Sequence, residues 1–330
     1  MQGRPAMYET YCYNRSTGLR TGLTLEEMQA VMKDTESVLW LDLCDIDDND
    51  IDLLTNVFNL HPLTVEDFIM PSARPKVEEF QDYLFLVVFS LQSGSNNQKF
   101  KIHMIEIDCC LGRNFLITFR SEVSNTVNIC KERVKKQSPI IMHGADMLLY
   151  SILDSCIDNY FPLINEFDNT VDAMSDELFQ VPTQNTLKKI YHLKNDIMSL
   201  RRTIGPQADV ISLLSRGTFK FITPGNQLYF RNVYDNMARF NDTVGALRDI
   251  ISGAMEAYVS IVSNRLNEVM KTLTVITTIM MPLTLIASIY GMNFKFMPML
   301  GHTLGFHVII GLMVIITVIM LLYFRRRKWL

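Results

Sequence analysis

The last 59 residues of this 330-residue chain contain no aspartate and no glutamate. All 35 acidic residues precede Thr272, whereas 5 of the 31 lysines and arginines follow it. The part before Thr272 therefore has 26 basic against 35 acidic residues, a formal charge of -9, and the tail has +5. An acidic, soluble part thus precedes an apolar part with a basic end. A soluble part of this charge does not indicate a nucleic-acid-binding surface.

Common catalytic motifs are also missing. The sequence has no Walker A loop, dinucleotide-binding fingerprint, HExxH or GxSxG, so we expect neither an enzyme nor an organic cofactor. None of the six cysteines forms a CxxC pair, which favours structural thiols in a reducing compartment. No apolar run follows the start MQGRPAMYETY, so we expect no signal peptide.

Two long runs near the C-terminus carry no charge. These uncharged runs, residues 272–290 and 304–324, are 19 and 21 residues long. At ~1.5 Å per residue, each would form a helix about 28 to 32 Å long. That length matches a hydrocarbon core of about 30 Å, so both runs are predicted to span a membrane. The alternative, two buried helices of a soluble domain, is disfavoured because soluble helices seldom avoid charge for so long.

Basic residues predict the orientation. The second run is followed at once by RRRK, whereas the connection between the runs has one lysine. Positive charge favours the cytoplasmic side. We therefore expect a multi-pass protein of the cell (inner) membrane, with both termini and residues 1–271 in the cytoplasm.

The part before the membrane changes character along its length. Short apolar runs at 37–43, 83–92, 101–112 and 114–119, separated by turn residues, indicate strands, whereas long helical patterns follow from about Gly144. The predicted segments are an α/β domain (1–135), a helical region with an acidic helix hairpin (136–226), a stalk helix (227–271), the first span (272–290), an extracytoplasmic loop (291–303), the second span (304–324) and a basic tail (325–330). The fold class is therefore α+β with a membrane part.

The stalk and the first span are predicted to form one helix. Residues 227–271 contain no proline and run directly into residues 272–290. A helix of that length needs partners along its flanks. An oligomer that bundles such helices is the economical explanation.

One face of this helix alternates small polar and bulky apolar residues. Its members follow each other at steps of three or four, as one helix face requires. Such a face could line a narrow water path with apolar constrictions, or could equally pack against other membrane helices. The face consists of Asn267, Met270, Leu273, Thr277, Met281, Thr284 and Ser288.

The turn between the spans carries a recognisable motif. YGMNF followed by MP stands between a proline-bearing span that ends IMMPLTLIASIY and a second span that ends YFRRRKWL. Together with HPLTVED, RPKVEEF, LLYSILDSCIDNYF and SNRLNEVMKTLT, this pattern resembles the CorA family of magnesium and cobalt transport channels over most of the chain.

The resemblance implies a funnel-shaped homopentamer in which five first spans surround the pore and the second spans form an outer ring. It implies a selectivity filter of Gly291, Met292 and Asn293, where five asparagine amides meet a hydrated Mg²⁺. It also favours the pore over packing, with Asn267 as a polar ring and Met270, Leu273 and Met281 as constrictions. A basic collar around the pore entrance would comprise Arg325, Arg326, Arg327 and Lys328.

Two departures from the family pattern matter. Met299 stands where relatives commonly have an acidic residue after MP, and Lys295 lies nearby, so the mouth is expected to attract cations less strongly. The resemblance also implies regulatory Mg²⁺ sites between adjacent cytoplasmic domains. Asn232 stands where the stalk partner is often Asp, so sensing is expected to be weaker or rebuilt around Asp235. The regulatory set is Glu66, Asp67, Asp154, Asn232 and Asp235.

The leading hypothesis is a channel for Mg²⁺, and for Co²⁺ and Ni²⁺, driven inward by the membrane potential and gated by intracellular Mg²⁺. Its expected partners are copies of itself, divalent cations and membrane lipid. One alternative is a transporter tuned to Co²⁺, Ni²⁺ or Zn²⁺, or an exporter, although no ring of cysteine or histidine on the proposed pore face supports a softer metal. Another is a membrane-anchored scaffold without transport.

Overall fold

The computed structural model describes residues 8–46, 48–72, 74–93, 102–136, 139–180, 182–293, 297 and 304–329. The chain divides into two compact units. The first unit holds a β-sheet with its covering helices, and the second holds the apolar end of the chain. The first comprises Met1–Gln180 and Asn185–Gly253, and the second comprises Val181–Gln184 and Ala254–Leu330.

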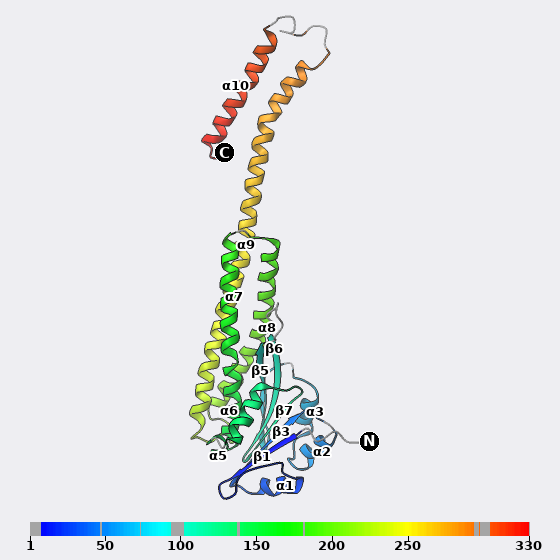
Figure 1. Cartoon of the computed structure of the whole chain (residues 1–330), viewed down its shortest axis with the longest axis vertical. Helices are drawn as coiled ribbons and strands as arrows, with labels where there is room; N and C mark the ends of the chain where they lie inside the picture. Colours follow the sequence, from blue (N-terminus) through cyan, green and yellow to red (C-terminus); the bar gives the residue numbers. More distant parts are fainter. Residues whose placement is uncertain are drawn as a thin grey trace. The chain divides into compact units, whose positions relative to one another are not determined.

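The first unit is built on a seven-stranded sheet in the order β2-β1-β3-β7-β6-β5-β4 (Figure 1). The central pair β3 and β7 is parallel, and the other neighbours are antiparallel. The strands predicted at the four apolar runs are confirmed. They are β3 (Ser37–Cys44), β5 (Tyr83–Ser93), β6 (Ile102–Gly112) and β7 (Phe115–Arg120). The others are β1 (Tyr8–Asn14), β2 (Gly18–Thr21) and β4 (Lys76–Glu79).

Three short helices pack on one face of the sheet. On β3, Leu39, Leu41 and Leu43 point to this face, because alternate residues of a strand point the same way, and they share a core with Met28 and Phe68 of the helices. Burying this apolar surface holds the helices to the sheet. The helices are α1 (Leu25–Lys33), α2 (Asp48–Asn56) and α3 (Pro62–Ile69).

Local sequence explains where α3 begins. His61 precedes the helix in an extended conformation, and its Nδ1 accepts a hydrogen bond of 3.2 Å from the backbone N–H of Leu63. Pro62 occupies the first helical position, where a missing N–H costs nothing. This start places Glu66 and Asp67 in the second turn of the helix.

Five helices, four of them longer than α1, α2 and α3, form the layer on the other face of the sheet. Tyr160 donates a hydrogen bond of 2.7 Å to the Phe89 carbonyl of β5, and its ring lies 5.9 Å from that of Phe240. These contacts join α7 to the sheet and to the first part of α9. The helices of this layer are α4 (Asn125–Lys135), α5 (Pro139–Met142), α6 (Ala145–Asp158), α7 (Tyr160–Gln180) and α8 (Gln184–Ser215).

One helix, α9 (Gln227–Tyr290), runs for 64 residues and continues without a break into the first apolar run. The predicted continuity of stalk and first span is therefore confirmed. Pro282 lies inside α9. The second apolar run forms α10 (Gly305–Arg326). In the described part of the chain, α9 and α10 are the helices long and apolar enough to cross a membrane.

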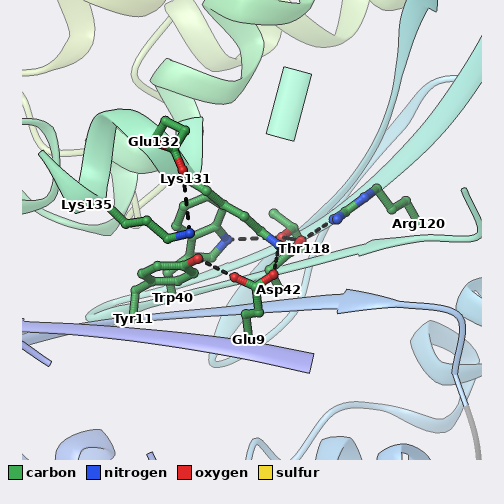
Figure 2. Close-up of polar contacts among 9 residues, drawn as sticks. All are labelled: Glu9, Tyr11, Trp40, Asp42, Thr118, Arg120, Lys131, Glu132 and Lys135. Carbon is green, nitrogen blue, oxygen red and sulfur yellow. Dashed lines mark hydrogen bonds and ion pairs between the residues drawn. The ribbon is translucent and has the colours of Figure 1, made fainter. Parts of the chain in front are cut away.

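Buried charges link the two central strands to α4 (Figure 2). Asp42 of β3 is 1% exposed and lies opposite Thr118 of β7, whose hydroxyl donates a hydrogen bond of 2.6 Å to it. Arg120 also donates to Asp42, and the Lys131 ammonium of α4 lies 2.5 Å from its other carboxylate oxygen. Lys131 also binds Glu9 of β1 at 2.7 Å. The two cations and two anions of this cluster balance, which indicates a structural role.

Removing Asp42 should destabilise the fold strongly. Asp42→Ala leaves the buried cations Arg120 and Lys131 without their shared anion, which costs about 3–5 kcal/mol. Glu132→Ala is the control, because Glu132 is exposed and pairs with Lys135 at 3.5 Å, a contact that contributes about 0–1 kcal/mol. Urea unfolding of the full chain in detergent, followed by Trp40 fluorescence in a Trp329→Phe background, measures both. Equal losses in the two variants would contradict the assignment.

Candidate functional site: the α9 face, the turn after it and the acidic groups of the first unit

The predicted pore face of α9 has no cover within its own chain. All seven side chains, from Asn267 to Ser288, are exposed. Met281 is 70% exposed, and Met270 and Leu273 are more than half exposed. Packing against α10 of the same chain therefore does not account for this face. A role in lining a pore or in contacting other copies stays a prediction.

Two hydroxyl groups on this face already donate hydrogen bonds within α9. Thr277 donates to the Leu273 carbonyl and Thr284 to the Met280 carbonyl, each at 2.8 Å, one turn earlier in α9. A hydroxyl that donates to its own helix keeps its oxygen lone pairs as acceptors. The face thus presents acceptor oxygens between bulky apolar side chains.

Gly291 directly follows the last residue of α9. Its N–H donates to the Ala287 carbonyl at 2.9 Å, and a Cβ added at this position would lie 3.1 Å from the same oxygen. Any larger residue would press on the last helical turn. Met292 and Asn293 follow at once and are exposed. Lys295 and Met299, on which the expected weakness of the mouth depends, lie outside the described residues.

The basic residues gather at the end of α10. Arg325 and Arg326 occupy its last turn, and the guanidinium of Arg327 lies 6.0 Å from the ring centre of Tyr323. Trp329, directly after Lys328, lines a groove of about 530 Å³ together with Asn267, Met270 and Lys271 of α9. Trp329 therefore lies beside the turn of α9 that carries Asn267.

The predicted regulatory residues lie on three helices of the first unit and have different neighbours. Asp67 of α3 forms an ion pair of 2.7 Å with Lys76. Burial, and then the charge of Asp158, raises the pKa of Asp154 on α6. On α9, Asn232 accepts a hydrogen bond of 3.3 Å from Asn236. The remaining two members are Glu66 on α3 and Asp235 on α9.

These five residues do not form a metal site within one chain. Among the residues that the structure describes, no three His, Cys, Asp or Glu side chains are arranged to hold a metal ion. A site shared between adjacent subunits, as the resemblance implies, needs groups from a second copy. The regulatory set therefore stays a prediction.

Sequence reasoning missed two acidic residues close to Asp67. Glu106 and Asp108 of β6 line the same cavity as Asp67. The sequence pattern did not indicate their burial, because Glu106 and Asp108 alternate with Ile105 and Ile107 as in a strand with one solvent-exposed face. Two carboxylates two residues apart on a strand near a helix that carries a third acid were the available signal.

Known proteins similar to this chain identify its family. Residues 35–326 match the model of the family described as CorA-like Mg2+ transporter protein. The chain is 37% identical over 300 residues to the cobalt/magnesium transport protein CorA of Thermotoga maritima, covering 90% of this chain and 85% of that protein. It is 31% identical over 291 residues to the putative metal ion transporter YfjQ of Bacillus subtilis, covering 88% and 89%.

The fold is that of a solved relative as well. The complete structure of the CorA magnesium transporter from Methanocaldococcus jannaschii matches with a TM-score of 0.81 at 21% identity, covering 97% of this chain and 98% of that one. The sheet unit, the long helix and the final apolar helix thus occur together in both proteins. On the family match and the 37% identity, this chain belongs to the family of CorA-like Mg²⁺ transporter proteins.

Proposed function

We propose that the chain forms a passive channel that admits Mg²⁺, with Co²⁺ and Ni²⁺ as further permeant ions, down the electrochemical gradient. The observation that carries the proposal is family membership over residues 35–326 together with Gly-Met-Asn at the exposed turn directly after α9. No ATP is needed, because moving two charges through 100 mV yields about 4.6 kcal/mol.

A homopentamer with the α9 helices around the pore would cover the exposed face of α9. Met281 and Leu273 would meet their copies as apolar constrictions, and Thr277 and Thr284 would offer acceptor oxygens to water between them. The uncovered state of this face in one chain supports the arrangement. Arg325, Arg326, Arg327 and Lys328 would form the basic collar on the cytoplasmic side, near anionic lipid.

Asn293 would select the ion without removing its water. Mg²⁺ releases its waters reluctantly, and an amide oxygen accepts hydrogen bonds from the first hydration shell. Asn293 stands three residues after the end of α9, at an exposed position. Met299 in place of an acid and the nearby Lys295 would make capture at the mouth weak.

Intracellular Mg²⁺ would gate the channel through Glu66, Asp67, Asp154 and the stalk residues of a neighbouring copy. Asn232 offers one oxygen ligand but no charge, so gating would need more Mg²⁺ than with an aspartate there. Asp235 lies three residues further along α9 and would supply the missing charge in part.

Replacing Asn293 by Ala should lower Mg²⁺ transport strongly. Losing a hydrogen bond to a charged species costs about 1.5–3 kcal/mol, which lowers Mg²⁺ flux by about tenfold or more. The assay is Mg²⁺ uptake into liposomes holding the purified chain, with Thr317→Val as the control. Thr317 is also in a predicted span, and its hydroxyl donates to the Met313 carbonyl at 2.9 Å. Undiminished flux in Asn293→Ala would show that Asn293 is not part of a selectivity filter.

Cysteine accessibility should separate a pore face from a packing face. We expect Thr277→Cys to react with a charged, membrane-impermeant thiol reagent and to lose Mg²⁺ flux, whereas Ile276→Cys, about 100° away on the helix, stays unreactive. The background is Cys44→Ser, because the other five native cysteines are buried. If Thr277→Cys is as protected as Ile276→Cys, the face is a packing surface.

Restoring the stalk charge should strengthen gating. In Asn232→Asp, protection of the chain from protease should appear at lower Mg²⁺ than in the wild type, because the carboxylate adds charge to the shared site. Asn236→Asp makes the same change one turn further along α9 and is the control. Identical protection curves for the wild type and Asn232→Asp would exclude residue 232 from the site.

A further inference from the structure

A cavity of about 170 Å³ lies in the first unit, between α3 and the strands β6 and β7. Its walls combine apolar side chains with acids. Phe68 of α3 and Phe119 of β7 form part of the apolar wall. The acidic residues in the lining are Asp45, Asp67, Glu106 and Asp108.

Strand register explains why acids converge there. Glu106 and Asp108 are two apart on β6 and therefore point to the same face of the sheet. Asp108 lies opposite Val87 of β5 and Phe119 of β7, so it belongs to an otherwise apolar row beneath α3. Asp67 comes from α3 above this row. Two elements thus bring three carboxyl groups to one cavity.

Asp108 is the unusual member of the group. Its side chain is 2% exposed, and its Oδ1 has no hydrogen-bond partner. Burial, and then the charges of Glu106 and Asp67, raises the pKa of Asp108 well above the ordinary carboxyl range. A buried polar oxygen without a partner costs about 1–3 kcal/mol, and more when it is charged. Such an oxygen at a cavity wall indicates a missing cation or donor.

Glu106 is better satisfied but has no cation of its own. Its Oε1 accepts a hydrogen bond of 2.7 Å from the backbone N–H of Ser72. Burial raises the pKa of Glu106 as well. The Glu106 carboxyl group also shares a hydrogen bond with the carboxyl group of Asp108.

One ammonium group lies close by and compensates the cavity only in part. Lys76 of β4 is 2.7 Å from Asp67 Oδ2 and 3.2 Å from Glu78 Oε1, so its single charge is divided between two carboxylates. Arg120 also lines the cavity, but its guanidinium is bound to Asp42. Asp67, Glu106 and Asp108 therefore share only part of the charge of Lys76.

We propose that this cavity binds a hydrated divalent cation of the Mg²⁺ type through Asp67, Glu106 and Asp108 of one chain. A bare ion does not fit the described residues, because no three acidic, His or Cys side chains are arranged to ligate it directly. Mg²⁺ keeps several waters and needs one or two carboxylates. A cavity of about 170 Å³ is large enough to hold several waters.

The site goes beyond the proposed gating, since it needs neither a neighbouring subunit nor a pore. Asp67 is the residue that it shares with the predicted regulatory set. Lys76 would hold Asp67 when the cation is absent and would compete with it when it arrives. Cation binding and the Lys76–Asp67 ion pair are therefore expected to oppose each other.

Counting bound Mn²⁺, a paramagnetic substitute for Mg²⁺, tests the site directly. Purified full-length chain in detergent is titrated with Mn²⁺, and the free ion is measured from its electron paramagnetic resonance signal. Asp108→Asn and Glu106→Gln should each bind one Mn²⁺ fewer per chain than the wild type, and added Mg²⁺ should displace that ion from the wild type. Glu79→Gln makes the same chemical change on an exposed acid of β4 and should keep the full count.

Two further measurements separate binding from folding. Lys76→Gln should lower the Mn²⁺ dissociation constant, because it removes the competing ammonium. Without metal, Asp108→Asn should melt at or above the wild-type temperature, because it removes an unpartnered buried carboxyl. If Asp108→Asn does not fold, Glu106→Gln decides. A wild-type Mn²⁺ count in the folded variants overturns the proposal, and this holds whether or not the chain conducts Mg²⁺.

Discussion

The exposed apolar surface of α9 is the physical constraint on how this chain assembles, because that surface must be covered. Side chains such as Met281, Leu285 and Ile276 are more than half exposed over the last five turns of a 64-residue helix. Apolar surface costs about 25 cal/mol per Å² in water, so a long uncovered stretch must meet lipid or another protein surface. Lipid suits the apolar positions but not the acceptor oxygens of Thr277 and Thr284. A bundle of copies with water on its axis satisfies both kinds of residue at once.

Buried charge in the first unit is handled in two different ways. Around Asp42, the cations Arg120 and Lys131 and the second anion Glu9 leave the cluster neutral, and the cluster joins β1, β3, β7 and α4. Around Asp108, carboxyl groups exceed cations and one oxygen has no partner. The first cluster explains how the sheet is held together. The second is the part of the fold in which a divalent cation would replace a missing partner.

The parts of the fold with continuous apolar signals could be predicted from the sequence. The four central strands were predicted from runs of Val, Ile, Leu and Phe, and α9 from the absence of breaking residues over 227–271. Strands β1, β2 and β4, which flank these four, were missed for a physical reason. β2 and β4 have four residues each and no buried side chain, and β1 mixes tyrosines with Glu9, Thr10 and Asn14, so none of the three shows a continuous apolar run.

The candidate sites divide in the same way. Gly291, Met292 and Asn293 stand out because a polar turn interrupts two apolar runs, and the residues around it carry the family resemblance. Asp108 could not be found like this, because its alternation with Ile107 resembles a wet strand face. Only the position of α3 over β6 shows that the face is closed. The regulatory residues depend on a second copy of the chain, which no pattern within one sequence can place.

The most direct test is Mg²⁺ flux through the purified chain alone. Liposomes that contain the chain and an internal Mg²⁺ indicator are given an inside-negative potential by a K⁺ gradient and an ionophore, without ATP. We expect Mg²⁺ entry that grows with the potential and is reduced by external Co²⁺. Entry no faster than into protein-free liposomes, at every potential applied, would contradict the claim that this chain is a divalent-cation channel.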